Sequence, residues 1–547
     1  MMFQKTKKAL ACLLCFAAVA GSTVGCASSG GGTSGTSAGS ASAGGDSSGK
    51  LSSTERQVNV VLEENENQPI ADYAPAQQQI FKETNIKLHF EVVSKSNYAD
   101  KKKVLLATNN LPDIIRVSSS DINDYGSTGI FLPLNDYFNS MPEFTKLWKS
   151  TPDYQKTMLE GKLYGFPFIC REETAFGAGP VIRTDLLEKN NLKTPKTFDE
   201  LLDVLTKLKK IYPDSSPWSV RKGTDKLLSI VAYMLGSGFD GYSNSTGIYY
   251  DKDKGKYIYG PATEEFKQVL SYLNKAYKAG VLDKDYATTT QEQWTEKLTS
   301  GKSFFFIDNS GFSLNYTKDL QKTVPTGKFQ LISIPTNTYG QARAVSYATN
   351  FTGSYFAVSA KAKDPETIMK FMNWTYTKHG SNICNYGVPG VSFEEDASEN
   401  PSFKKDYVSK FKDGKSTPYY AIYKDMGITK LNFAPWGCNT KTQLEIMKDL
   451  GQWSKDEDAY WTTVEEDKAY QDPVINPPLT KSETSRVKEL NTSLNTVLEQ
   501  EYNKYIMGMK DISTYDEVIA KAKSMGATEL EKIYNDANQR SLSTKVN

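Results

Sequence analysis

The side chains that could support chemistry are unevenly distributed in this sequence, and histidine is nearly absent. Only His89 and His379 occur among 547 residues, whereas most metallohydrolases and serine hydrolases require histidine as a ligand or a base. His89 lies in the alternating stretch KLHFEVV and His379 near the end of a predicted helix, so we expect both to be structural. Aspartate and glutamate total 64, so carboxylate pairs suited to glycoside hydrolysis identify no active site. We expect no catalytic residue and no enzymatic activity.

Cysteine is a second source of chemistry, and one of the six cysteines follows an apolar segment. A basic N-terminus precedes the apolar run from Ala9 to Ala20. That run is too short to span about 30 Å of hydrocarbon but suits a secretion signal, so we assign residues 1–25 to a signal peptide. The stretch TVGC ending at Cys26 resembles a bacterial lipobox, which implies a lipid on the Cys26 sulfur and cleavage before it. An ordinary signal peptide cut nearby is the alternative.

The segment after Cys26 is dominated by glycine and serine. Of its 24 residues, from Ala27 to Lys50, eight are glycine and eight are serine. Such a chain cannot bury enough apolar surface to offset the entropy lost on ordering, so we expect a flexible tether within residues 26–54. Its mean span is roughly 25–30 Å. The sequence therefore predicts a body anchored by lipid on the extracellular face of the cytoplasmic membrane.

The composition of the rest of the chain excludes several classes of protein. The remaining length is too great for one core and allows two or more domains. No later stretch approaches 18 unbroken apolar residues, as a membrane-spanning helix would require. Basic residues number 65 against 64 acidic ones, and no long basic run occurs, which argues against a nucleic-acid partner. We expect a monomer.

Neither the remaining cysteines nor the acidic stretches have metal-site spacing. Cys170, Cys384 and Cys438 are widely separated, so one disulfide is possible but its pairing is not determined. The stretch DKDKGKYIYG from Asp251 has glycine and lysine where an EF-hand loop requires an oxygen ligand and glycine. A hairpin between GIYY and KYIYG fits it better. We expect no metal and no cofactor, although a structural calcium held by other residues stays open.

Strand and helix patterns alternate along the chain. QVNVVLEE and IKLHFEVV predict strands, and PAQQQIFKETN and ADKKKVLLATNN predict helices. LPDIIRV, GKSFFFIDNSG and FQLISIPT predict further strands. The alternation indicates a mostly parallel sheet covered by helices, in which ligands bind beyond the carboxyl ends of the strands.

Several predicted helices carry clear end signals or apolar faces. Thr197 is a predicted N-cap with Glu200 three residues later, as in a capping box. EEFKQVLSYLNKAYKAG predicts a helix that Gly280 ends. From Ser482 onward, apolar residues at i, i+3 and i+4 spacing predict a helix docked on the core: Val487, Leu490, Leu494, Leu498, Tyr502 and Tyr505.

The collinear order of several segments resembles one family. These segments are LYGFPF, VIRTDLLEKNNLKTPKTFDELLDVLTKLKK, YLNKAYKAGVLDKD, GKSFFFI, SYFAVSAKAKDPETIMKFMNW and NYGVPGVSFE. The chain is similar to the extracellular solute-binding lipoproteins of ABC transporters, of the large carbohydrate-binding type (family 1-like) found in Gram-positive bacteria. The resemblance extends over nearly the whole mature chain, and the order of the segments carries it rather than any single motif.

The resemblance implies an α/β fold of two lobes. This is the periplasmic-binding-protein-like fold, type II-like, with lobes joined by hinge strands and a helical C-terminal extension. Gly177 and Gly179 would lie at a crossing between the lobes, where they either give freedom for closure or mark a strand-end bulge. The implied boundaries assign residues 55–177 and 352–415 to lobe 1, and residues 178–351 and 416–547 to lobe 2.

The resemblance also implies a function. The protein would capture an oligosaccharide between its lobes and deliver it to the transmembrane permease subunits of an ABC importer. A peptide-binding ABC receptor is the alternative, and a secreted glycoside hydrolase with paired carboxylates is a less favoured one. The sequence indicates neither the sugar nor its length.

A sugar site needs planar hydrogen-bonding groups beside aromatic rings, so we expect ligand contacts from such residues near strand ends and in loops. Some of them follow or begin predicted strands, and Trp218 and Trp436 lie in the loop sequences SPWSVRKG and NFAPWGCN. The candidates are Glu66, Asp113, Arg171, Glu172, Trp218, Asp308, Asn309, Phe351, Tyr386 and Trp436.

Overall fold

The structure is a computed structural model, and it separates the chain into a unit up to Ser47 and a compact unit from Ser48 to Asn547. The predictions for Cys26, Glu66 and Trp436 lie outside the described residues. In the strands, the side chains of residues 169–172, 346, 351–352 and 438–439 are likewise not described. The described residues are 49–64, 73–151, 155–172, 177–239, 247–346, 351–412, 418–428, 438–439, 444, 446–448, 450–451, 453–470 and 474–543.

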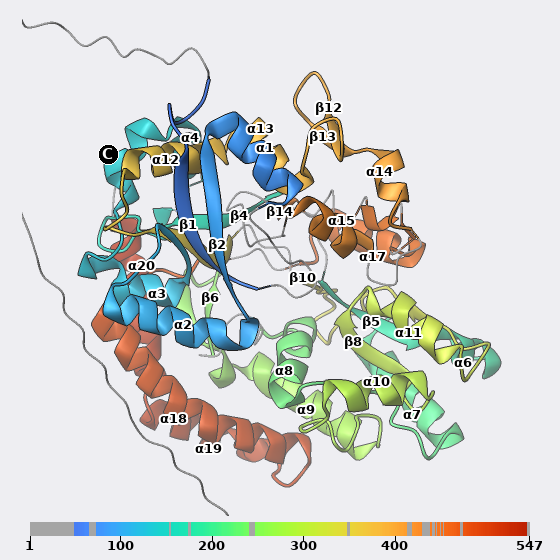
Figure 1. The fold of residues 1–547 in the computed structure, drawn as a ribbon. Coiled ribbons are helices and arrows are strands. Elements are labelled where there is room, and N and C mark those ends of the chain that lie inside the picture. The colour runs from blue at the N-terminus through green and yellow to red at the C-terminus, as the bar shows by residue number, and fades with distance from the viewer. Residues whose placement is uncertain are drawn as a thin grey trace, which may run out of the picture. The chain divides into compact units, whose positions relative to one another are not determined.

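The first sheet has six strands in the order β14-β4-β11-β3-β1-β2 (Figure 1). Parallel pairing joins β1 to β2 and β3, and β4 to β14, whereas β11 runs antiparallel to β3 and β4. The sheet is therefore mixed, because β11 returns to it from a distant part of the chain. Its strands are β1 Arg56–Glu63, β2 Ile86–Val93, β3 Ile114–Ser118, β4 Phe166–Glu172, β11 Phe351–Val358 and β14 Cys438–Asn439.

Helices cover both faces of the first sheet (Figure 1). In β1, Val58 and Val60 pack with one set of helices, and Val61 packs on the opposite face, as the twofold alternation of a strand requires. The first set is α1 Pro75–Thr84, α4 Pro142–Ser150, α12 Pro365–Trp374 and α13 Lys378–Tyr386; the opposite set is α2 Lys95–Thr108 and α3 Ser119–Tyr125.

The second sheet is built around β5, which is buried at every residue. β8, β9 and β10 all pair with β5 in the antiparallel direction, so the mostly parallel sheet that the sequence predicts does not form here. A strand that is buried throughout must have hydrogen-bonded neighbours, and β5 has them along its whole length. The strands are β5 Gly177–Arg183, β8 Phe305–Asn309, β9 Phe329–Leu331 and β10 Val345–Ser346.

Two apolar clusters pack around the second sheet. Ile182 and Phe305 belong to the larger cluster and Val181 and Phe306 to the smaller one, so neighbouring residues of each strand point to different cores. The larger cluster includes the helices α6 Thr184–Lys189, α7 Phe198–Ile211, α8 Gly223–Met234 and α9 Glu264–Lys278 together with the C-terminal helices described below, and the smaller includes α10 Gln291–Thr299, α11 Phe312–Leu320 and α17 Lys455–Glu466.

The predicted hairpin and C-terminal helix are both confirmed. β6 Ile248–Asp251 pairs antiparallel with β7 Lys256–Tyr259. The six residues of the predicted apolar face are all buried in the larger cluster of the second sheet. Lys488 on that helix also forms an ion pair of 2.6 Å with Asp124 of α3. The helices are α18 Lys481–Ile506, α19 Tyr515–Ser524 and α20 Ala527–Ser543, and no described helix is long and apolar enough to cross a membrane.

The helix-end predictions hold with one difference. The Thr197 hydroxyl accepts a hydrogen bond from the Glu200 N–H at 3.1 Å, as an N-cap does. The Glu200 carboxylate accepts from Lys196 instead of Thr197, so the capping box is shifted by one residue. Gly280 follows α9 with a φ of 67°, as a helix stop requires.

Two other expectations are corrected by the order of the elements. His379 lies in the first turn of α13, not near the end of a helix, and it contacts Glu83 and Glu395. Ile422 of α15 packs with Ala76 of α1, and β14 joins the first sheet, so these two elements beyond residue 415 lie with lobe 1 rather than lobe 2. The remaining elements are β12 Phe393–Glu395, β13 Pro401–Phe403, α14 Lys405–Ser409, α15 Pro418–Met426 and the 3₁₀ helices Gly126–Thr128, Leu134–Ser140, Gly260–Ala262 and Ile512–Thr514.

Gly179 serves close packing in β5. Its pairing with Asp308 is part of an unbroken register, so no bulge occurs there, and its φ is not positive. A Cβ added to Gly179 would lie 2.5 Å from Leu331 Cδ1 and 3.3 Å from the Tyr460 ring. Only glycine lets β9 and α17 approach this strand so closely.

We predict that Gly179→Ala destabilises the protein by about 1–3 kcal/mol, because the added Cβ overpacks the core against Leu331. Equilibrium unfolding in urea measures the change. Leu331→Ala makes room at the same point, so the double variant should lose less stability than the sum of the two single variants. Strictly additive losses would contradict the packing explanation.

Glu457 makes the stability of α17 depend on pH. It is fully buried, and its carboxylate accepts the Ser454 N–H at 3.1 Å. Burial raises its pKa above the ordinary value of 4.5, although hydrogen bonds from Ser454 and Ser310 oppose the shift. A raised folded-state pKa favours the protonated acid, so its stabilising contribution is lost as the pH rises through that pKa.

Glu457→Gln should therefore gain stability over the unsubstituted protein as the pH rises from about 4.5 to about 7, because the neutral amide still accepts the capping hydrogen bond. Urea unfolding across that range tests the prediction. Glu466→Gln on the exposed face of the same helix is the control and should give no such gain. Equal behaviour of the two variants would refute the role of Glu457.

Candidate functional site

A first group of polar side chains lies at the carboxyl end of β3, in the middle of the first sheet. The Arg116 guanidinium is 5.0 Å from the Phe168 ring centroid on β4, and its Nη2 donates to Ser354 Oγ on β11 at 3.4 Å. Burial lowers the pKa of Arg116, and the nearby Tyr98 and Glu63 oppose this shift. Three strands thus supply a cation, a hydroxyl and an aromatic face to one half-buried place, called here the first polar edge.

The chain turns sharply at the first polar edge because of local capping. Ser118 caps α3 by accepting the Asp121 N–H, and the Asp121 carboxylate accepts the Ser118 N–H at 2.8 Å. Lys102 holds the same carboxylate at 2.5 Å. Ser119 donates to the Gly353 carbonyl at 3.2 Å, where the φ of Gly353 is 70°. These bonds fix the start of α3 against β11, next to Arg116.

A second group lies at the carboxyl end of β8, called here the second polar edge. Arg221 Nε donates to Asp308 Oδ2 at 2.7 Å, and Nη2 donates to Oδ1 at 2.8 Å. Its Nη1 donates to Gln291 Oε1 at 2.6 Å. The guanidinium lies 5.5 Å from the Trp294 ring centroid and 5.1 Å from that of Phe312. A bidentate pair between aromatic rings holds the guanidinium in one plane.

Charge at the second polar edge is concentrated. Burial lowers the pKa of Lys226, and the neighbouring Arg221 and Lys222 lower it further, while Asp308 opposes them. Asp308 is only 2% exposed. Because one carboxylate faces several cations, this edge favours ligand groups that accept hydrogen bonds.

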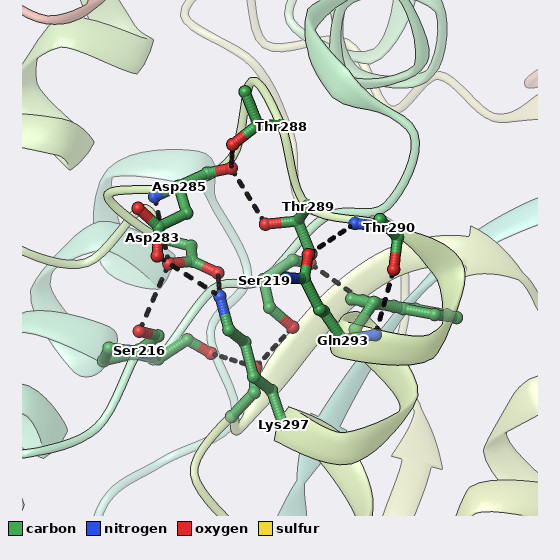
Figure 2. Close-up of polar contacts among 12 residues, drawn as sticks. Ser216, Ser219, Asp283, Asp285, Thr288, Thr289, Thr290, Gln293 and Lys297 are labelled. Carbon is green, nitrogen blue, oxygen red and sulfur yellow. Dashed lines mark hydrogen bonds and ion pairs between the residues drawn. The ribbon is translucent and has the colours of Figure 1, made fainter. Parts of the chain in front are cut away.

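A polar network behind the second polar edge fixes α10, which carries Gln291 and Trp294 (Figure 2). Lys297 forms an ion pair with Asp283, whose carboxylate also accepts from the Ser216 hydroxyl at 3.4 Å. The Trp294 indole N–H donates to the Ser219 carbonyl at 3.3 Å. Buried polar groups bonded in this way hold one arrangement of the helix, and with it the ring beside Arg221.

The strands that cross between the sheets connect the two polar edges. β4 carries Phe168 in the first sheet, and the chain then continues into β5, where Ala178 pairs with Asn309 of β8. β11, which carries Ser354, follows β10, and β10 pairs with the same end of β5 at Gly177. In both cases, two strands that are consecutive in the chain belong to different sheets, one to the sheet of each polar edge.

The structure separates Asp113 from the first polar edge. Asp113 precedes β3 at its amino end, where its Oδ2 accepts the Asn59 N–H at 2.9 Å and the Asn59 side-chain amide at 3.0 Å. Arg56 lies 3.8 Å from its other oxygen. This carboxylate fastens β1 to β3 at the end of the strand opposite Arg116, so the structure gives Asp113 a structural role.

Two predicted aromatic contacts lie inside cores. Trp218 is 1% exposed and packs edge-to-face on Phe305, with centroids 5.4 Å apart. Its backbone bridges to Leu282, so the loop carrying it is a buried part of the second lobe. Tyr386 is 2% exposed and packs against Phe403 at 4.8 Å. In this structure neither ring is a platform open to a ligand.

Other predicted residues do lie at the polar edges. Asp308 and Asn309 end β8, and the Asn309 side chain accepts the Gly311 N–H at 2.9 Å. Arg171 and Glu172 end β4, and the backbone of Glu172 pairs with Asn439 of β14. Phe351 begins β11 opposite Ile169 of β4.

Sequence reasoning missed Arg116 and Arg221. Arg116 is the one charged residue of β3, and a charged residue within an apolar strand is the signal of a position that is not fully buried. Arg221 is three residues beyond Trp218 in the loop SPWSVRKG, in which the sequence predicts a ligand contact from the tryptophan and not from the arginine. In the described part of the chain, no group of three or more histidine, cysteine or acidic side chains could hold a metal ion.

Comparison with known proteins agrees with a fold of two lobes. Residues 64–380, more than half of the chain, match the family model of bacterial extracellular solute-binding proteins. The chain belongs to this family. The sequence resemblance to solute-binding proteins is confirmed, and this is a family of binding proteins rather than of enzymes.

Individual relatives agree with this assignment. The polygalacturonan/rhamnogalacturonan-binding protein YtcQ of Bacillus subtilis is 24% identical over 469 residues, which cover 84% of this chain and 87% of YtcQ. The alginate-binding protein AlgQ2, solved without calcium ion, superposes with a TM-score of 0.68 at 23% identity, covering 90% of this chain and 99% of AlgQ2. FusA of Streptococcus pneumoniae in complex with kestose gives 0.65 at 18%, covering 90% and 100%. These likenesses confirm the two-lobe α/β fold.

We predict that Asp308→Asn destabilises the protein by about 3 kcal/mol or somewhat less, because it leaves the Arg221 guanidinium, only 14% exposed, without its ionic partner. Asp203→Asn breaks an exposed helical pair with Lys207 and should cost no more than about 0.5 kcal/mol. Urea unfolding of the two variants gives the comparison. Equal, small losses of stability would show that the buried pair of Arg221 and Asp308 stabilises the protein no more than an exposed ion pair does.

Proposed function

We propose that this solute-binding protein captures an oligosaccharide and delivers it to an ABC importer. The observation that carries the proposal is the pair of polar edges, each with a guanidinium 5.0–5.5 Å from the centroid of an aromatic ring. Sugars present many hydroxyls, which accept from planar cations and donate to carboxylates and carbonyls. The ligand would contact both edges and so favour the closed arrangement of the lobes.

Known relatives support carbohydrate as the ligand class. YtcQ is named for binding polygalacturonan and rhamnogalacturonan, and FusA for fructooligosaccharide. AlgQ2 is named for alginate, and another protein of this fold for HMO. The cations near Asp308 suit a sugar that carries carboxylates as well as a neutral one. We therefore place acidic plant-wall oligosaccharides first and fructo-oligosaccharides second.

A thermal-shift screen of the chain from Ser48 tests the ligand class. The panel contains oligogalacturonides, alginate oligosaccharides, fructo-oligosaccharides and short peptides. A ligand at about 100 times its Kd should stabilise the protein by about 2.7 kcal/mol. Chromatography of each positive ligand then shows whether it is recovered intact. Shifts with peptides alone would favour the peptide receptor, and cleaved sugar would favour the hydrolase.

Arg116→Ala should weaken binding of that ligand at least tenfold, which equals about 1.4 kcal/mol, because it removes the cation of the first polar edge. Titration calorimetry measures the affinity. Arg56→Ala removes an arginine from the amino end of the same sheet and should leave the affinity unchanged, as should Asp113→Asn. Loss of affinity in all three variants would indicate general damage to lobe 1 rather than a site at Arg116.

We also propose that Cys26 anchors the protein to the outer face of the cytoplasmic membrane, where permease subunits receive the ligand. The lipobox-like TVGC and the Gly/Ser-rich tether support this arrangement. Cys26→Ala in a Gram-positive host should move the protein from the membrane fraction to the medium and abolish labelling by a fatty-acid probe. Retention in the membrane with the label unchanged would refute Cys26 as the lipid site.

A further inference from the structure

Two cysteines far apart in the sequence meet in the first sheet. β14 pairs with β4 in the parallel direction, and the register places Cys438 opposite Cys170. The two residues are 268 positions apart, so nothing in the sequence indicates this pairing. Three disulfide pairings are possible among Cys170, Cys384 and Cys438, and the backbone pairing of β14 with β4 favours the one between Cys170 and Cys438.

The spacing of neighbouring strands suits a disulfide bond. Adjacent strands lie about 4.7–4.9 Å apart, and the Cα atoms of a disulfide are about 4.4–6.8 Å apart. Residues directly opposite each other in a ladder lie on the same face of a sheet. The register shifts immediately after Cys438, where Asn439 pairs with Glu172. This irregularity lets the backbone of β14 deviate from ideal strand geometry beside Cys438, as the Cα–Cα distance of a disulfide can require.

The third cysteine is unsuited to compete for this bond. Cys384 lies on α13, is 2% exposed and is a free thiol in the apolar core of the first sheet. Burial raises the pKa of its thiol well above the usual range, with a smaller contribution from Glu83. A thiol that is not ionised neither attacks a disulfide nor oxidises readily.

We propose that Cys170 and Cys438 form a disulfide bond outside the cell. The two thiols lose two electrons and two protons to an external disulfide, which leaves as two thiols, and a sulfur–sulfur bond joins β4 to β14. An extracellular setting permits such a bond to persist. Cys384 stays reduced.

The position of this bond gives it a consequence for ligand binding, and this part rests on the proposed function. Arg171 follows Cys170 directly, and Trp436 precedes Cys438 by two residues. The bond would therefore link the two chain segments that carry these ligand-binding candidates. Reduction would release β14, a strand of only two residues, from the edge of the sheet.

The experiment counts thiols in the chain from Ser48, which contains only these three cysteines. The protein is equilibrated with excess oxidised glutathione, unfolded in denaturant and alkylated. We expect one alkylated thiol without reductant and three with it. Trypsin should yield the peptide of residues 163–171 linked to that of residues 431–441. Three thiols in both samples, or a link to the peptide containing Cys384, would overturn the proposal.

Single variants add a control that does not depend on ligand. Cys170→Ser and Cys438→Ser should each expose two thiols, whereas Cys384→Ser should expose none. Reduction should then lower both the Tm and the sugar affinity of the unsubstituted protein, and change neither in Cys170→Ser. If the linked peptide is found but the affinity is unchanged on reduction, the bond stands and its proposed effect on the ligand is refuted.

Discussion

The chain of this protein passes twice between two sheets, and at each passage consecutive strands are hydrogen-bonded into different sheets. β4 and β11 are neighbours in the first sheet, and the strands that adjoin them in sequence, β5 and β10, pair with each other in the second. A strand bonded on both sides cannot slip without breaking its ladder, so the crossing fixes which residues come near it. Arg116 and Asp308 are both placed by this constraint, one beside β11 and the other beside β5.

Local signals in the sequence predicted much of the fold. The Thr197 cap, the hairpin from Ile248 to Tyr259 and the buried face of α18 each depend on a few neighbouring residues, whose spacing has one physical meaning. The mixed sheets were not predictable in this way. β11 pairs with β3, and β14 with β4, across long stretches of sequence. The residues of β11 and β14 do not indicate with which strand they will pair.

The candidate site was less accessible to sequence reasoning because contacts between distant residues decide it. Trp218 and Trp294 are both aromatic residues beside polar neighbours in the sequence and both are buried, yet Trp218 packs on Phe305 whereas Trp294 lies against the Arg221 guanidinium. Asp113 directly precedes β3 and Arg116 lies within it, so only the direction of the strand separates a structural carboxylate from a residue of the first polar edge. The family resemblance predicted the two-lobe fold. The structure was needed to show that Arg116 lies beside Phe168 and that Arg221 lies beside Trp294 and Phe312.

The C-terminal helices bear on how such a chain can be exported. The larger core of the second lobe combines residues from Ala178 to Val345 with residues from Leu479 to Ala537. This core is incomplete until nearly the last residue is available, so a chain still threading through a secretion channel has no finished lobe to fold around. Contacts between such distant segments also form slowly. The late position of α18 to α20 thus means that the core of the second lobe closes only when nearly the whole chain is available.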